Sequence, residues 1–237
     1  MPHVSEALIE CHMHVFDPAR FPYAADAWYQ PLPGETGSPA QLGHVLDAHG
    51  VRHALIVGPN SGYGPDNRCL LDTIARGAGR YKGITVVGNE ASRGELQDLR
   101  AAGIVGVAFN VAPLLRDSGA RLLFDHCGRP DPRAGVGQAG FAALLDLART
   151  GRACVKLSGL AKCSALPYPY ADAGVYVRAL VEACTPQSLV WASDWPFLRA
   201  PERIDYGPLL RLFEQPLPDA QARQAIFWHT PKRLFGF

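Results

Sequence analysis

Residues Ala7 to Pro18 read ALIECHMHVFDP and set a pattern that later parts of the chain repeat. The stretch begins with three apolar residues, which is typical of a buried strand. His12 and His14 follow two residues apart, so their side chains are expected on one face of this strand. Two imidazoles at a strand end can bind a metal or transfer protons. The alternative interpretation is a pair of surface histidines. Polar residues at the ends of the later strands argue against this alternative.

Further apolar stretches typical of strands alternate with helical patterns along the chain. The predicted strands after the first are 53–57, 83–87, 104–111, 121–126, 153–157 and 189–193. The predicted helices are 39–49, 67–77, 93–102, 141–150, 175–183 and 219–229. This alternation predicts βαβ units around a parallel sheet, and near-continuously apolar strands indicate burial on both faces. We therefore expect one α/β domain over residues 1–237, a TIM-type barrel with its helices outside.

One βα unit of this barrel is predicted to be missing or shortened. Only Ala112–Ala120 separates the strand that ends at Val111 from the strand that begins at Arg121. A parallel crossover needs a dozen or more residues, usually with a helix. Seven strands are therefore expected where a closed barrel of this type has eight. We expect a gap in the sheet here, or a true chain with further residues at this point, rather than a well-closed barrel of seven strands.

Composition narrows the class of protein. The 237 residues carry a net charge of +1 and no basic run, which argues against nucleic acid as a partner. No apolar run is long enough to span a membrane, and the N-terminus has no secretory pattern. The six cysteines include no CxxC pair, which favours buried reduced thiols over disulfides. We expect a cytoplasmic protein with a small-molecule substrate; its oligomeric state, a homo-oligomer included, stays open.

Polar residues gather where the predicted strands end, which is where α/β folds place their active sites. They come from nearly every strand: His12, His14, Asn60, Ser61, Tyr63, Asn89, Asn110, Asp125, His126, Lys156, Ser158 and Asp194. Scattered surface residues would not coincide so regularly with strand ends. We therefore expect a functional site at these strand ends.

Three positions carry more specific chemistry. Asp194, in WASDWP, can act as a general base or bind a metal, and the alternative is an N-cap of the following segment. His126 is followed by Arg129, whose guanidinium suits a substrate carboxylate, and the alternative is a solvated loop arginine. Lys156 lies inside an apolar strand, so it needs a partner or an open barrel interior.

Several motifs taken together resemble the amidohydrolase-related family (amidohydrolase 2), in the branch of 2-pyrone-4,6-dicarboxylate lactonase and sugar-lactone lactonases. In chain order they are HMHVFDP, GPNSGYGPDNRCLLD, GVAFN, DHCGRPDP, VKLSG, WASDWPFLRAPERIDYGPLL and WHTPKRLFGF. The HxH pair alone is a weak signal, but with DHxGRPD and SDWP it is specific, and the resemblance covers nearly the whole chain. Two departures are Glu10, where the family usually has Asp, and the absent strand-five unit between Val111 and Ala112.

The resemblance implies a (β/α)₈ barrel that hydrolyses a lactone or a similar ester. It implies that Asp194 activates water, while His12 and His14 polarise the carbonyl or hold the site. It also implies that an arginine binds a substrate carboxylate. The substrate-binding residues that we predict are Arg129, Tyr63, Asn67, Asn110, His126 and Lys156.

Three functions are open from the sequence. The first is a hydrolase that opens a carboxylated lactone with Asp-activated water, with or without a metal. The second is a metal-dependent hydrolase or decarboxylase, with a divalent ion such as zinc on His12, His14 and Asp194. The third is a degenerate barrel that binds a ligand or partner without catalysis, since a fold does not imply a function. We predict the first, with either no cofactor or a divalent metal.

Overall fold

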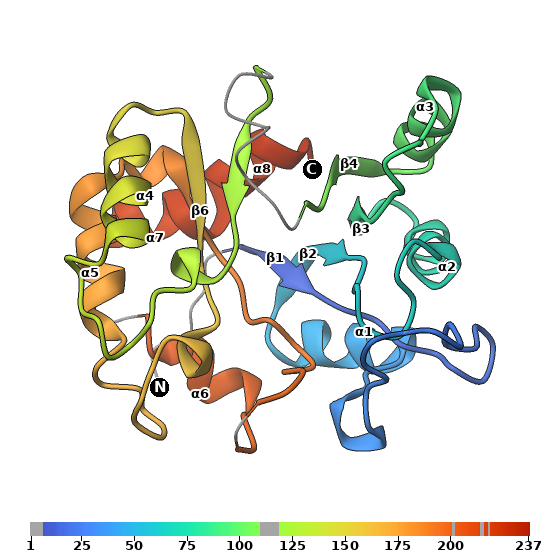
Figure 1. The fold of residues 1–237 in the computed structure, drawn as a ribbon, viewed down its shortest axis with the longest axis horizontal. Coiled ribbons are helices and arrows are strands. Elements are labelled where there is room, and N and C mark those ends of the chain that lie inside the picture. Colours follow the sequence, from blue (N-terminus) through green and yellow to red (C-terminus); the bar gives the residue numbers. More distant parts are fainter. Residues whose placement is uncertain (1–6, 110–118, 201, 214–215, 218) are drawn as a thin grey trace. The chain divides into compact units, whose positions relative to one another are not determined.

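The computed structural model describes residues 7–109, 119–200, 202–213, 216–217 and 219–237. Contacts within the chain group these residues into two compact units (Figure 1). The first unit contains residues 8–109, 194–199 and 237, and the second contains residues 7, 119–193 and the described part of 200–236. Each unit has a sheet of its own, and the single domain over 1–237 stays a prediction.

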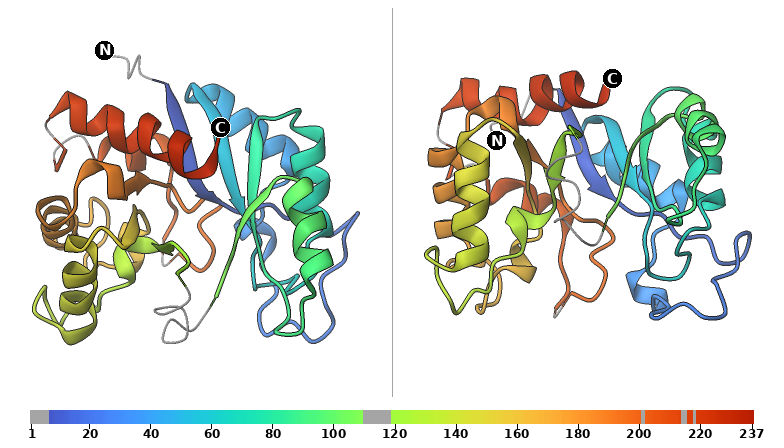
Figure 2. Two further views of the ribbon diagram at one scale, coloured as in Figure 1. Left: turned by 90° about the horizontal axis from the view of Figure 1, so that it is seen from above. Right: turned by 45° about the horizontal axis from the view of Figure 1, so that its top comes forward.

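The first unit is a four-stranded parallel sheet with a helix after each of its first three strands. Its strands are β1 (Leu8–Met13), β2 (Val51–Val57), β3 (Tyr81–Thr85) and β4 (Ile104–Val107), in that spatial order. Its helices are α1 (Pro39–Ala48), α2 (Arg68–Arg76) and α3 (Arg93–Ala101), and a short 3-10 helix, Pro33–Glu35, precedes α1. The three α-helices lie along one face of the sheet (Figure 2), which is the arrangement of βαβ units.

β1 is the most deeply buried strand of this sheet. All six of its residues are buried, and so are the last four residues of β2. The loop after β1 ends in a capping box at the start of α1. In this box Ser38 Oγ accepts from the Gln41 N–H, and Gln41 Oε1 accepts from the Ser38 N–H. The capping box therefore fixes the start of α1 at the end of this loop.

The second unit is a three-stranded parallel sheet with five α-helices among its described residues. Its strands are β5 (Leu122–Phe124), β6 (Ala153–Leu157) and β7 (Leu189–Trp191), in that order. Its helices are α4 (Ala139–Arg149), α5 (Gly174–Ala183), α6 (Tyr206–Arg211), α7 (Ala220–Gln224) and α8 (Thr230–Phe235). Short 3-10 helices occur at His126–Gly128, Leu160–Lys162 and Pro186–Ser188. α4 packs against β6 and against α5 (Figure 1), and Trp191 is buried against the rings of Tyr206, Phe213 and Phe227.

The observed elements follow the predicted order with two differences near the C-terminus. α6 is a helix that the sequence pattern does not predict. The predicted helix 219–229 consists of α7 and a π-helical turn, Ala225–His229, which continues into α8. Pro231 stands in the first turn of α8. Because proline has no N–H to continue the α-helical ladder, it accounts for the break.

The sheet is interrupted where the sequence predicts it. Within the described residues, β4 pairs only with β3 and β5 only with β6. β4 ends at Val107, before the predicted end at Val111. Asn110, Val111 and most of the short link 112–120 lie outside the described residues.

Composition predicts buried reduced thiols and no membrane-spanning segment. All six cysteines are free and buried, as predicted. Among the residues that the structure describes, no helix has both the length and the apolar character of a membrane span.

Candidate active site

Two histidines and an aspartate converge in the first unit. His12 Nε2 lies 3.2 Å from His14 Nε2. Asp194 Oδ1 lies 3.7 Å from His12 Nε2 and 3.8 Å from His14 Nε2. His12 is 2% exposed and Asp194 4%. The structure thus brings together the three predicted catalytic side chains, with the carboxylate oxygen slightly farther from each ring than a hydrogen bond allows.

The ends of β1 and β2 orient His14. This residue directly follows β1, and its Nδ1 lies 2.8 Å from the carbonyl oxygen of Val57 at the end of β2. A carbonyl oxygen can only accept, so Nδ1 carries the hydrogen. In the neutral ring, Nε2 therefore presents a lone pair toward His12 and Asp194. The 3.2 Å approach of the two Nε2 atoms then places the shared hydrogen on His12.

Glu10 supports the same strand from inside the core. Its side chain is fully buried, and its Oε1 accepts from the backbone N–H of His12 at 3.0 Å. A buried carboxylate needs such a partner. The sequence marks Glu10 only as a departure from the family pattern, and its contact with the His12 backbone is a role that sequence reasoning missed. The available signal was an acidic residue within an apolar strand.

Asp194 is held by backbone contacts with the end of β1. Its φ is 69°, in the left-handed region that few residues other than glycine adopt. Its N–H donates to the carbonyl oxygen of His12 at 3.0 Å, and the N–H of His14 donates to that of Trp195 at 2.9 Å. Met13 and Trp195 also form an isolated parallel bridge. Backbone strain of this kind persists where the surrounding contacts fix a residue, often at functional sites.

The N-cap interpretation of Asp194 is wrong. The next described α-helix is α6, which begins at Tyr206 and has Asp205 as its N-cap. Asp194 instead precedes a turn, in which its carbonyl oxygen accepts from the Phe197 N–H at 2.9 Å. Its carboxylate is therefore directed to the two histidines by a turn, not by a helix.

The three side chains can move a proton or hold a cation. Their facing atoms lie within 4.8 Å of one another. Tetrahedral zinc with bonds of about 2.1 Å separates its ligand atoms by about 3.4 Å, which is close to the observed 3.2 to 3.8 Å. The geometry therefore fits a divalent metal such as zinc, with further ligands from solvent or substrate. It also fits a general base beside two imidazoles.

Tyr63 and Asn67 lie in the first unit with their polar groups against the backbone. The Tyr63 ring stacks on Phe16, and its hydroxyl accepts from the Asp17 N–H. Burial raises the pKa of the Tyr63 hydroxyl well above its ordinary value. Asn67 Nδ2 donates to the carbonyl oxygen of Val86 at 2.7 Å. These contacts hold the loop after β1 and the end of β3, and contact of either side chain with a substrate stays a prediction.

The second unit gathers polar residues at the ends of β5 and β6. Lys156 is 2% exposed, and its Nζ lies 2.8 Å from Asp125 Oδ1. His126 Nδ1 lies 3.0 Å from Ser158 Oγ. Asp125 is thus the partner that a lysine inside an apolar strand requires. Both pairs come from residues that the sequence predicts at strand ends.

Arg129 lies at the end of a left-handed turn in this unit. His126, Cys127, Gly128 and Arg129 all have positive φ, and the Arg129 N–H donates to the His126 carbonyl oxygen at 2.8 Å. The Arg129 side chain is exposed. Its guanidinium is therefore accessible to a ligand carboxylate. The predicted partner in substrate binding, Asn110, lies outside the described residues.

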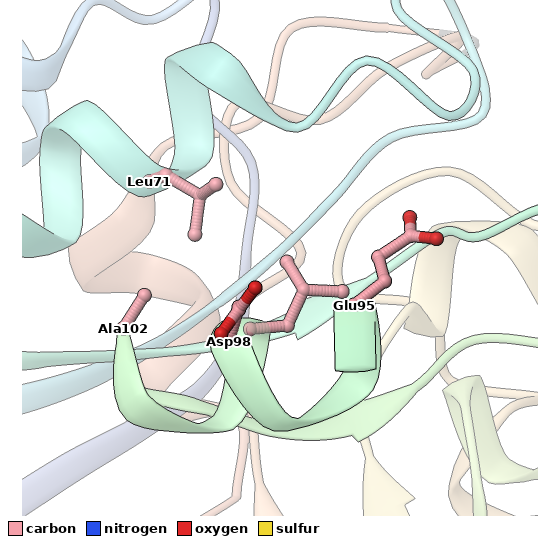
Figure 3. Close-up of a pocket in the computed structure, with 5 residues that line it drawn as sticks. Leu71, Glu95, Asp98 and Ala102 are labelled. Atoms are coloured by element: carbon pink, nitrogen blue, oxygen red, sulfur yellow. The ribbon is translucent and has the colours of Figure 1, made fainter. Parts of the chain in front are cut away.

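A surface hollow in the first unit lies between α2 and α3 (Figure 3). Its lining residues are Leu71, Glu95, Asp98, Leu99 and Ala102. None of the predicted site residues contributes to it. Because its carboxylates belong to exposed residues, the hollow lacks the buried titratable groups expected of a catalytic site. We therefore place the candidate active site at His12, His14 and Asp194.

Comparisons with known proteins give the same family as the sequence motifs. The amidohydrolase family model matches residues 9–122 and 115–237. The 4-sulfomuconolactone hydrolase of Rhizobium radiobacter is 30% identical over 271 residues, covering 96% of this chain and 89% of that protein. The 2-pyrone-4,6-dicarboxylate hydrolase of Comamonas testosteroni is 26% identical over 277 residues, with 96% and 89% covered.

A solved structure extends the likeness to the fold. A probable 2-pyrone-4,6-dicarboxylic acid hydrolase of Acinetobacter baumannii has a TM-score of 0.86 and 26% identity, covering 97% of this chain and 99% of that chain. The alignment with the Rhizobium protein extends over 271 positions, more than the 237 residues of this chain. The alignment therefore includes residues of that relative that have no counterpart in this chain. The chain belongs to the amidohydrolase family, with the α/β fold class of TIM-type barrels and the hydrolase activity of that family.

Proposed function

We propose that this protein opens the ring of a carboxylated lactone with a water molecule that Asp194 activates. The convergence of Asp194 with His12 and His14 carries the proposal. A mostly buried carboxylate beside two imidazoles suits general base catalysis at a carbonyl group. The two relatives described above are named as hydrolases of a lactone and of a pyrone dicarboxylate, which supports the same class of reaction here.

In the proposed reaction, Asp194 takes a proton from water while the water oxygen bonds to the lactone carbonyl carbon. The tetrahedral intermediate then breaks the bond between that carbon and the ring oxygen. The proton passes from Asp194 to the ring oxygen, which leaves as a hydroxyl group, so the product is a hydroxy acid. His12 Nε2–H, which the tautomer inferred above directs at His14 Nε2 in the absence of substrate, donates instead to the substrate carbonyl oxygen as negative charge develops there.

A carboxylate of the substrate is the proposed ligand of Arg129. The exposed guanidinium offers a fork of donors that matches a carboxylate. The Acinetobacter relative was solved with citric acid bound, and the Comamonas relative is named for a dicarboxylate. Both relatives support an anionic substrate. The remaining proposed substrate contacts are Tyr63, Asn67, Asn110, His126 and Lys156.

A metal-dependent hydrolase or decarboxylase is a second candidate, which the spacing of the three ligand atoms favours. His12, His14 and Asp194 would hold a divalent ion such as zinc. When bound, the ion would act as a Lewis acid and lower the pKa of its water. Elemental analysis of protein purified without chelator distinguishes the candidates. Stoichiometric metal that His14→Asn abolishes would support the second, and full turnover by metal-free protein would support the first.

Location in the cytoplasm is part of the same proposal. The six cysteines are free and buried, which suits a reducing compartment. Fractionation of the native host would test it. Recovery with membranes or in the extracellular fraction would contradict it.

Asp194→Asn tests the reaction, because a carboxamide keeps the shape but cannot take a proton. We expect ring opening of a carboxylated lactone to fall by about a thousandfold, with an unchanged melting temperature. Asp98→Asn, on the exposed surface of α3, is the control and should keep full activity. Turnover retained by Asp194→Asn would remove Asp194 as the base. Lactone binding by the wild type without any turnover would favour a non-catalytic barrel.

A further inference from the structure

Residues 28–37, between β1 and α1, pack against residues 194–199; we call them the 28–37 loop and the 194–199 turn. Gly37 meets the side chain of Trp195. A Cβ atom added at Gly37 would overlap Cη2, Cζ3 and Cζ2 of the indole, and the Gly37 φ lies outside the left-handed region. The requirement for glycine is therefore steric. The Gly37 carbonyl oxygen accepts from the Phe16 N–H at 2.9 Å, which fixes the loop to the chain after β1.

A second contact joins the loop to the far end of the turn through Glu35. Its Oε1 accepts from the backbone N–H of Arg199 at 2.9 Å. Its Oε2 accepts from the Leu32 N–H at 3.0 Å and from the Tyr29 hydroxyl. One carboxylate thus receives three donors, of which two belong to the loop and one to the turn. An amide side chain has a single oxygen, so it could not accept at both positions.

Arg199 provides a third contact through its side chain. Its guanidinium carbon lies 5.5 Å from the ring centroids of both Trp28 and Tyr29. This distance is within the range of cation–π attraction. The 28–37 loop therefore contacts both ends of the 194–199 turn, at Trp195 and at Arg199.

Asp194 is the first residue of this turn, and its left-handed backbone needs external support. β1 supports one side through the backbone of His12 and His14. The loop supports the other side through the contacts above. We infer that Gly37 and Glu35 are positioning residues that hold the Asp194 carboxylate against the two histidines. This inference rests on the proposed role of Asp194 as the base.

Gly37→Ala and Glu35→Gln test the inference, with Gly34→Ala as the matched control. Gly34 lies in the same loop, and a Cβ there would meet nothing within 4 Å. We expect Gly37→Ala to lower kcat by about tenfold to a hundredfold, because displacements of about 1 Å have effects of that size. KM should stay within about twofold, since the substrate-binding residues are untouched. Gly34→Ala should leave both constants unchanged, and Glu35→Gln should lower kcat without changing KM.

A double-mutant cycle with Trp195→Phe separates positioning from simple destabilisation. Phenylalanine lacks the outer edge of the indole, so Gly37→Ala should lower kcat much less in that background. An equal loss in both backgrounds would overturn the inference. So would unchanged kcat in both Gly37→Ala and Glu35→Gln while Asp194→Asn is inactive, a result that would leave the proposed base intact. Activity of Asp194→Asn would instead refute the proposed function.

Crystal structures of the two glycine variants give a readout that needs no activity. The distance from Asp194 Oδ1 to His12 Nε2, 3.7 Å here, should lengthen in Gly37→Ala and stay the same in Gly34→Ala. An unchanged distance in Gly37→Ala would overturn the inference. If Gly37→Ala fails to fold, the same distance in Glu35→Gln decides it.

Discussion

At the scale of single residues, the proposed role of Arg129 in binding a substrate carboxylate depends on the planar guanidinium group and its fork of donors. It follows three residues with positive φ, and its side chain is exposed. Arg129→Lys keeps the charge but loses the bidentate fork. We therefore expect KM for a carboxylated lactone to rise by about tenfold, the worth of one charge-assisted hydrogen bond. KM for a neutral lactone should not change.

Arg133→Lys is the control for this prediction, because Arg133 is also exposed in the same loop region. It should leave both KM values unchanged. Equal effects of Arg129→Lys on charged and neutral lactones would remove Arg129 from the substrate site.

At the scale of elements, an ion-pair network ties the loop after β1 to α2. Arg20 of the loop makes two hydrogen bonds to the Asp72 carboxylate, and Arg76 makes another. The hydrogen bonds from Arg20 lower the pKa of Asp72 from 3.8 to about 2. A lowered pKa means that this carboxylate stabilises the fold above its ordinary pKa and loses that effect as the pH falls toward 2.

Asp72→Asn should therefore lower the melting temperature at neutral pH and have a shrinking effect below about pH 4. Thermal melts of the variant and the wild type from pH 7 to pH 2 measure this. Asp26→Asn, an exposed carboxylate in the same loop, should show no such pH dependence. A difference between Asp72→Asn and the wild type that stays constant down to pH 2 would contradict the assigned network.

At the scale of the whole molecule, the thiols report on the integrity of both units. All six cysteines are buried and free. Burial raises the thiol pKa of Cys69 and of Cys184 to about 11. At pH 8 a thiol of that pKa has only about one thiolate in a thousand molecules, against about a quarter at the ordinary pKa of 8.5.

We expect a thiol reagent such as Ellman's reagent to label the native protein slowly and to titrate six thiols after denaturation. The rate of labelling should rise together with loss of the folded signal in urea. Rapid labelling of one thiol in native protein would contradict its burial and would identify the unit that opens.

Much of this fold can be predicted from local patterns in the sequence. Apolar stretches predict each of the seven strands in the described part of the chain, because the burial of a strand depends on the apolar character of a few consecutive residues. The pairing of His12 with His14 follows from the two-residue period of a strand, even though His14 lies just beyond β1. The short link 112–120 predicts the interruption between β4 and β5, since chain length limits what a crossover can span.

The tertiary structure decided what each polar group is used for. Asp194 reaches the histidines through backbone contacts with β1, from far along the chain. Asn67 donates through its amide to the backbone carbonyl oxygen of Val86, a contact that the sequence did not predict. Glu35 carried no sequence signal, and its role depends on an N–H of Arg199. Hydrogen-bonding groups of one residue type are chemically alike along a sequence, and only the backbone that folding brings beside them selects their partners.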